Sequence, residues 1–197
     1  DLHPAVSAAL DTASSALADA GYQVETIEPP LLREAAEVGV RCMFTETKAL
    51  LGKDIEQHGS DTLKKVFAEY FRQFPPYEPQ EYLERIAERA RFVRAWTVFM
   101  EEWPLVLTPF LPAPTFAWDR DAQGPDGVRE VLGSAIYSYS MNFMGLPAAN
   151  VPASYNDGQP IGVQIVGRRF REDLLLDAAE VIERKVGVMA ERLWAGV

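Results

Sequence analysis

Few residues in this sequence carry side chains that could act as a nucleophile or as a base. Cys42 is the only cysteine, and neither of the two histidines, His3 and His58, stands in a motif that would pair it with a nucleophile. A single thiol cannot form an intrachain disulfide, which is typical of proteins from a reducing compartment. We therefore expect Cys42 to be a small buried side chain. We expect neither a metal site nor a cofactor, because two isolated histidines are poor ligands.

The charge of the chain disfavours two classes of partner. Its 29 acidic residues outnumber its 19 basic residues, the net charge is -10, and the basic residues form no long run. An acidic surface repels nucleic-acid phosphates and anionic lipids, so we expect no nucleic acid and no membrane partner. No window reaches the roughly 18 apolar residues of a membrane span, and residues 1–4 do not resemble a signal peptide. These features predict a cytoplasmic protein.

The first 30 residues predict a helix followed by a strand. Apolar residues recur at spacings of three and four from about residue 3 to residue 20, and Gly21 ends this amphipathic helix. Residues 22–28 then alternate in polarity, which predicts a strand that the Pro29-Pro30 pair terminates.

Residues 31–103 predict helices only. The first helix covers roughly residues 32–51, and the second begins after a Ser60 cap and closes at Pro75-Pro76. The third begins near Pro79 and is long, because its apolar positions keep the helical period as far as Trp103.

The remainder returns to strands. The apolar run at residues 105–107 predicts a covered strand that leads into the proline-rich loop 108–114. A polar stretch and a helical segment at 131–144 follow. Two strands, at 149–153 and 161–166, are joined by a turn at Asn156-Asp157-Gly158, and an amphipathic helix that contains Leu174, Leu175, Ala178, Val181 and Ile182 closes the chain.

These elements predict a single α/β domain over residues 1–197. It consists of a helix-strand unit at 1–30, a helical segment at 31–103, and strands with a closing helix at 104–197. With 48% hydrophobic residues the chain is long enough for one sizeable core.

The most specific pattern lies near the C-terminus. Residues 139–153 read YSMNFMGLPAANVPA, residues 158–167 read GQPIGVQIVG, and residues 173–176 read DLLL. Together they resemble the C-terminal signature of the amidase signature family. Weaker similarities to the same family lie in residues 106–109 and 5–29. The resemblance implies the C-terminal part of that family's mixed-sheet α/β/α fold, with a helical segment in the middle.

The resemblance also implies a reaction, hydrolysis of the C-N bond of a carboxylic amide. Members of the family use a serine nucleophile, a second serine and a lysine, with backbone amides as the oxyanion hole, and this machinery sits upstream of the signature found here. The pair Ser14-Ser15 lies in an alanine-rich helix without flanking glycines, so it does not match. The five lysines lie in polar stretches where a solvated charge is expected: Lys48, Lys53, Lys64, Lys65 and Lys185. We therefore expect a C-terminal fragment without catalytic residues, inactive alone.

In an intact enzyme of this type, residues of this part would line the pocket for a small-molecule amide. The helix around residues 42–44 is a further candidate lining element, and for each aromatic the alternative is core packing. For five signature residues a structural role in turns and strands is favoured over a catalytic one: Asn142, Gly145, Pro147, Gly162 and Gln164. The candidate substrate-binding residues are Phe110, Leu111, Pro112, Tyr139 and Asn142.

Two alternatives stay open. The family includes the amide-hydrolysing component of transfer-RNA-dependent amidotransferases, although the acidity of this chain argues against direct RNA contact. A non-catalytic binding or scaffold module could also retain only this fold and use residues 31–103 for partner contact. In either case a half-domain leaves strand edges and apolar patches, so we expect a homo-oligomer or self-association.

Overall fold

The computed structural model describes residues 2–195, and these fall into two compact units. The sheet unit comprises the chain up to Pro30, residues 96–115 and the residues from Gly145 onward. The helical unit comprises residues 31–95 and 116–144. Each unit therefore combines segments that are distant in the sequence.

The sheet unit is built on three antiparallel strands. β1 (Leu105–Pro109), β2 (Ala148–Asn156) and β3 (Gln159–Gly167) lie in the order β1-β3-β2, so β3 is hydrogen-bonded on both sides. β2 and β3 form a hairpin whose turn residues, Asp157 and Gly158, have φ values of 47° and 82°. A turn with positive φ at both central residues matches the twist of the flanking strands, which is why the Asp-Gly pair predicts the hairpin correctly.

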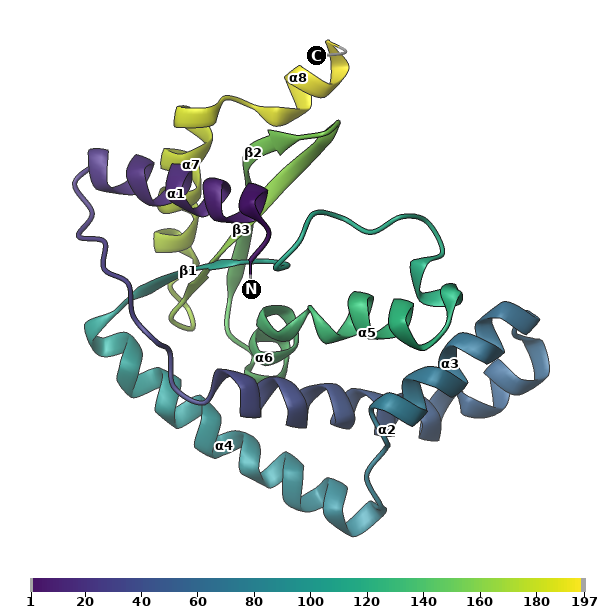
Figure 1. Ribbon diagram of the computed structural model, residues 1–197. Coiled ribbons are helices and arrows are strands. Elements are labelled where there is room, and N and C mark those ends of the chain that lie inside the picture. Colours follow the sequence, from purple (N-terminus) through teal and green to yellow (C-terminus); the bar gives the residue numbers. More distant parts are fainter. Residues whose placement is uncertain (1, 196–197) are drawn as a thin grey trace. The chain divides into compact units, whose positions relative to one another are not determined.

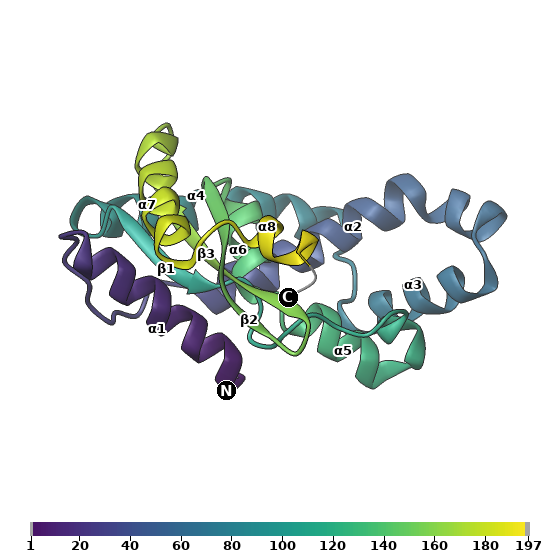
Figure 2. The ribbon, with the colours of Figure 1, turned by 90° about the horizontal axis from the view of Figure 1, so that it is seen from above.

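Two helices cover one face of this sheet (Figures 1 and 2). α1 (Pro4–Asp19) has proline in its first turn and is capped by His3, whose Nδ1 accepts the N–H of Ala5 at 3.2 Å. α7 (Glu172–Val186) is followed by the short α8 (Met189–Trp194). The shared core consists of Val6, Ala9, Ala13, Leu17, Val151, Ala153, Ile161, Val163, Ile165, Leu175, Ala178 and Ile182.

The prediction of a strand at residues 22–28 is wrong. The chain there is extended but pairs with no other strand among the described residues. Only Tyr22 and Ile27 are partly buried, and Val24 is 44% exposed. Two inward positions five residues apart do not follow the period of two that a half-buried strand requires. Alternating polarity was therefore not enough, since a strand also needs a hydrogen-bonded neighbour.

The helical unit begins with two helices in sequence. α2 (Leu32–His58) runs one to two turns beyond the predicted end near residue 51, because Gly52 lies within the helix and the chain turns only at Gly59. α3 (Asp61–Gln73) is capped by Ser60, whose Oγ accepts the N–H of Leu63, as predicted.

The long third helix is confirmed as α4 (Pro79–Glu102), of which residues 79–95 belong to the helical unit. The next segment differs from the prediction. A 3₁₀ turn, η1 (Arg120–Gln123), precedes α5 (Pro125–Gly133), and α6 (Ile136–Met144) is separate from α5. One helix was predicted at 131–144, whereas Gly133 ends α5 there.

Packing in the helical unit depends on aromatic rings and on one close helix contact. The ring of Phe44 on α2 lies 5.4 Å from that of Tyr70 and 5.8 Å from that of Phe74, which joins α2 to the end of α3. α6 packs along α2 (Figure 1) at Gly39. A Cβ atom at Gly39 would lie 2.6 Å from the Cβ of Phe143, closer than real contacts allow. The absence of a side chain at position 39 therefore permits this contact.

The α/β fold class is confirmed: the part of the chain that the structure describes is rich in helices and contains a small antiparallel sheet. Whether residues 1–197 fold as a single domain stays a prediction, because two compact units in one chain can still fold together.

Gly39 and Gly52, both in α2, provide a matched test of the helix contact. We expect Gly39→Ala to lower the free energy of unfolding by up to about 2 kcal/mol, because overpacking costs about 1–3 kcal/mol and helix propensity returns about 1 kcal/mol. At Gly52 the nearest atom to an added Cβ is 3.8 Å away, so Gly52→Ala should stabilise by up to about 1 kcal/mol. Urea denaturation of both variants measures this, and equal effects would contradict the close contact.

Candidate functional site

The first group of predicted site residues lies directly after β1 in the sheet unit. Phe110 is 37% exposed, and Leu111 and Pro112 are half-buried. The carbonyl oxygen of Pro112 accepts the N–H of His3 at 2.8 Å, which fixes the loop to the start of α1. The loop therefore holds a partly exposed aromatic ring on a backbone that is anchored at both ends.

A buried pair of polar side chains lies in the sheet next to the start of this loop. Gln164 at the centre of β3 is 2% exposed, and its Nε2 donates to Oγ1 of Thr108 on β1 at 3.2 Å. The two residues are also register partners. The structural role favoured for Gln164 from the sequence agrees with this bond, whose partner is a side chain. This bond fixes the register of β1 two residues before Phe110.

The second group of predicted site residues lies on α6 in the helical unit. Asn142 is exposed, and its Nδ2 donates to Oγ of Ser138 at 3.4 Å. Tyr139 is half-buried, its Oη is enclosed, and it has no hydrogen-bond partner within residues 2–195. Burial raises the pKa of Tyr139 above its ordinary value, so the phenol stays protonated and remains a donor. A buried hydrogen-bond donor without a partner costs folding free energy, which makes Tyr139 a candidate for a functional role.

The structure adds two polar residues close to Tyr139 that the sequence did not indicate. The Oη of Tyr70 on α3 donates to Oδ2 of Asp121 in η1 at 2.5 Å. The pKa of Tyr70 is raised by burial first, then by the hydrogen bond to Asp121, with a smaller electrostatic contribution from Tyr139. These residues are 51 positions apart and Tyr70 fits the apolar face of its helix, so only the fold brings them together.

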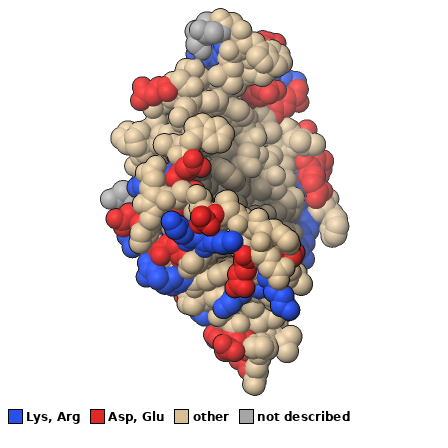
Figure 3. Space-filling view, turned by 90° about the vertical axis from the view of Figure 1, so that its right-hand side faces the viewer, with Lys and Arg blue, Asp and Glu red and all other residues tan. Residues whose placement is uncertain are grey.

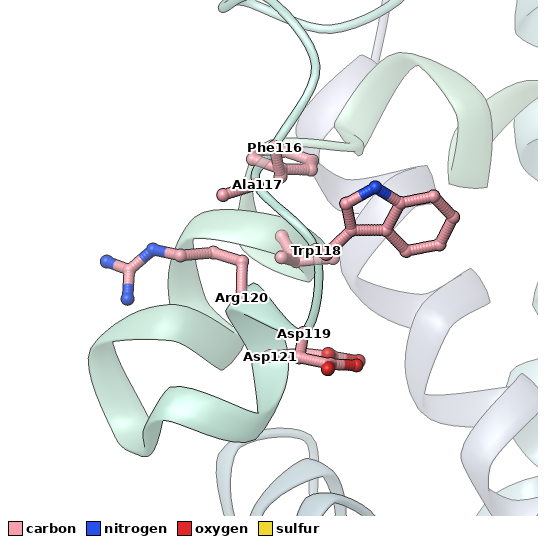
Figure 4. Close-up of a pocket in the computed structure, with 7 residues that line it drawn as sticks. Phe116, Ala117, Trp118, Asp119, Arg120 and Asp121 are labelled. Carbon is pink, nitrogen blue, oxygen red and sulfur yellow. The ribbon is translucent and has the colours of Figure 1, made fainter.

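Asp121 also lines a depression of the helical unit, which has a volume of about 280 Å³. Figure 4 shows the side chains of Trp118, Asp119 and Asp121 pointing to one side of the segment and that of Arg120 pointing to the other. The lining residues are Phe116, Ala117, Trp118, Asp119, Arg120, Asp121 and Val131.

The candidate helix around residues 42–44 contributes mainly to the core. Cys42 and Phe44 are both 3% exposed, and Phe44 is part of the aromatic cluster with α3, so core packing explains both. Met43 is 41% exposed. Burial is the largest cause that raises the pKa of Cys42 to about 11, and the nearby Glu46 adds to it. A protonated, enclosed thiol is a poor nucleophile.

Two serines and one lysine of the described chain are engaged by structural partners. Oγ of Ser14 donates to the carbonyl oxygen of Asp11 at 3.1 Å, and buried Ser140 donates to that of Ile136 at 2.7 Å. Nζ of Lys185 forms an exposed ion pair with Asp19. On the face seen in Figure 3, basic and acidic side chains lie next to one another rather than forming a patch of one sign.

Two further kinds of feature are absent from the described residues. No three His, Cys, Asp or Glu side chains within this part of the chain are grouped as metal ligands. No helix within residues 2–195 combines the length and the apolar character that crossing a membrane requires.

Comparison with known proteins decides the family. The family model described as Amidase matches residues 1–176. The chain belongs to the Amidase family. It is 34% identical to the indoleacetamide hydrolase of Bradyrhizobium japonicum over 195 residues, which are 98% of this chain and 42% of that relative. It is also 36% identical over 98 residues to one component of the glutamyl-tRNA(Gln) amidotransferase of Brucella ovis, 49% of this chain and 20% of the relative.

A solved structure supports the same fold. The 6-aminohexanoate cyclic dimer hydrolase in complex with substrate superimposes with a TM-score of 0.73 at 22% identity, over 96% of this chain and 43% of that chain. This member of the Amidase family thus spans less than half the length of the relatives it matches. The substrate-binding role of Phe110, Leu111, Pro112, Tyr139 and Asn142 stays a prediction, and the structure places the first three in one unit and the last two in the other.

The buried pair of Gln164 and Thr108 yields a quantitative expectation. Gln164→Leu should lower the free energy of unfolding by about 1–3 kcal/mol, because it leaves a buried hydroxyl without its partner. Thr108→Val should cost a similar amount, because it leaves the buried amide of Gln164 without this partner. The double variant should be more stable than the sum of the single effects predicts by about 0.5–1.5 kcal/mol, the net value of one neutral hydrogen bond. A double-mutant cycle in urea measures this coupling, and strict additivity would contradict the bond.

The raised pKa of Cys42 predicts slow thiol chemistry. A pKa of about 11 leaves roughly one thiolate in a thousand at pH 8, against about one in ten at the ordinary value of 9.0. We expect a disulfide reagent to label the folded chain at least about 100-fold more slowly than the urea-unfolded chain, and labelling to accelerate as the pH approaches 11. Because the folded pKa is the higher one, the associated stability is full below pH 9 and declines between pH 9 and 11. Rapid labelling at pH 8 would show that the thiol is accessible.

Proposed function

We propose that this chain is the C-terminal region of an amidase, and that the complete enzyme hydrolyses the C-N bond of a carboxylic amide. The observation that carries the proposal is the match of 98% of this chain to only 42% of an indoleacetamide hydrolase. The proposal assigns the nucleophile to polypeptide upstream of these residues and no catalytic residue to the chain itself.

The chemistry of an amide explains why such a division is needed. The amide carbon resists attack until an alkoxide-like nucleophile forms and the developing oxyanion is stabilised. We assign these tasks to a Ser-Ser-Lys set, in which a desolvated neutral lysine serves as the base. The lysines described here are unsuited to that role. Lys48, Lys53, Lys65 and Lys185 are exposed, and Lys64 is only partly covered.

The chain would then contribute to the walls of the substrate pocket. In the sheet unit the candidate wall is the anchored loop of Phe110, Leu111 and Pro112, and in the helical unit it is the α6 face of Tyr139 and Asn142. Tyr139 is the stronger of the two polar candidates, because its protonated, enclosed hydroxyl has a hydrogen bond to donate.

An aromatic amide is the substrate class that we favour for a first assay. The relative at 34% identity is named for indoleacetamide, and the chain presents exposed aromatic side chains at Phe110 and Trp118. Aromatic rings recognise flat apolar groups through stacking and area burial. The proposal includes no nucleic-acid contact, a cytoplasmic location and self-association of the isolated chain.

The proposal predicts a clear difference between the chain and the complete protein. Residues 1–197 alone should release no ammonia from indoleacetamide, whereas the polypeptide encoded by the whole natural reading frame should release it. A coupled ammonia assay with a serine-directed inhibitor as control measures both. Serine-reagent-sensitive hydrolysis by the chain alone would contradict the assignment of the nucleophile to upstream sequence.

The reading frame itself distinguishes the alternatives. An upstream lysine followed by a glycine-rich serine-serine segment supports the enzyme, and its absence supports a non-catalytic binding module. If the complete protein transfers ammonia to a charged transfer RNA rather than to water, the amidotransferase alternative replaces the simple amidase.

A further inference from the structure

We propose that the depression in the helical unit binds a planar ring that carries an N–H donor, and that Trp118, Asp119 and Asp121 recognise it. This assignment rests on the proposed function, because it identifies the ring as the part of the amide substrate that does not react. All residues of the depression lie in the segment 116–121 or, for Val131, in α5.

The carboxylate of Asp121 is held in a fixed orientation. Its Oδ2 accepts the hydroxyl of Tyr70 at 2.5 Å, which connects η1 to α3. Gln73, one turn further along α3, donates from Nε2 to the carbonyl oxygen of Pro125 at 2.7 Å. These two bonds attach η1 and the first residue of α5 to the same helix. A carboxylate that is already oriented loses little freedom when it accepts a ligand.

The one basic residue of the segment is directed away from the two carboxylates (Figure 4). Nε of Arg120 donates to Oε2 of Glu130 at 2.7 Å, and its Nη1 donates to Gln123. The backbone of η1 can approach α5 because position 127 is glycine: a Cβ there would lie 1.9 Å from the carbonyl oxygen of Arg120. The charge of Arg120 is thus neutralised by Glu130, on the side of the segment away from the two carboxylates. The carboxylate oxygens of Asp119 and Asp121 therefore form no ion pair with Arg120.

The other walls are apolar. Phe116 and Val131 line the depression, and the indole ring of Trp118, 95% exposed, lies on the same side of the segment as the two carboxylates (Figure 4). A large ring left in water can bury area against a flat ligand and can also interact with a cation. A volume of about 280 Å³ is at the small end of ligand pockets, which are typically about 300–1,000 Å³. The depression is therefore suited to a single ring system rather than to a whole large ligand.

The acceptor-only character of carboxylates defines the ligand further. A carboxylate accepts hydrogen bonds and carries negative charge, so Asp119 and Asp121 disfavour an anionic group and select an N–H donor, either a ring N–H or an ammonium. Within the described residues no third carboxylate, thiol or imidazole is grouped with these two as in a metal site. An organic N–H donor on a flat ring satisfies both the acceptors and the apolar walls.

Binding of ring compounds to the complete protein tests the proposal without any turnover. The probes are indole, 1-methylindole and benzylammonium, and isothermal titration gives their affinities. Indole or benzylammonium, or both, should bind at least about tenfold more tightly than 1-methylindole, because a hydrogen bond to a charged acceptor is worth that much. Tighter binding of indole than of 1-methylindole indicates that the site prefers a neutral N–H donor. Tighter binding of benzylammonium indicates that it prefers a charged N–H donor.

Matched variants distinguish this site from the rest of the surface. Asp121→Asn and Asp119→Asn should reduce the advantage of the donor probes, and Trp118→Ala should weaken all three probes. Asp177→Asn on α7 and Trp194→Ala on α8, both at exposed positions in the sheet unit, should change nothing. A circular dichroism melt of each variant shows that it is folded.

Failure of this inference is distinguishable from failure of the proposed function. If 1-methylindole binds as tightly as the donor probes, if none of the three binds, or if the advantage survives in both aspartate variants, the inference is overturned while amide hydrolysis can still be observed. If the donor probes bind as expected and no amide is hydrolysed, the ring site stands and the proposed reaction falls.

Discussion

β3 is the element on which the sheet unit depends. It is hydrogen-bonded to β1 on one side and to β2 on the other, so both edge strands obtain their register from it. Its side chains alternate between two environments. Val163 and Ile165 join α1 and α7 in the core, whereas Gln164 points to the other face and bonds to Thr108. A shift of one residue would move the amide into the aliphatic core and the aliphatic residues out of it, which makes the register strongly specified.

That register has consequences for the candidate site. Thr108 is fixed by Gln164, Pro109 ends the strand, and the loop of Phe110 to Pro112 follows at once. The position of the loop is therefore determined by buried contacts of β3 rather than by the loop's own sequence. The same logic holds in the helical unit, where Tyr70 and the Gly127 contact position Asp121. In both units, residues that could meet a ligand depend on partners far away in the sequence.

Much of the fold follows from local sequence patterns, and the exceptions have physical reasons. The hairpin, α1, the Ser60 cap and the long α4 were predicted because turn residues, caps and helical periodicity act within a few residues. The strand at 22–28 was wrong, since pairing is a tertiary property. The site shows the same division. Tyr139 was found from its place in the signature, but Tyr70 and Asp121 come from patterns that describe a core helix and a polar loop, and only the fold connects them.

The order of segments along the chain bears on how the molecule is made. α1 is synthesised before its partners, because those of Val6 and Ala13 lie on β2, β3 and α7, which follow more than a hundred residues later. Contacts of such wide sequence separation must close long loops before they stabilise anything, so the sheet unit should form late and slowly. The helices of residues 31–95 depend on contacts close in sequence, so they can form much earlier than the sheet unit. During synthesis the apolar face of α1 therefore remains without these partners until they are made. A chaperone, or a transient covering by other chain, would be valuable at that stage.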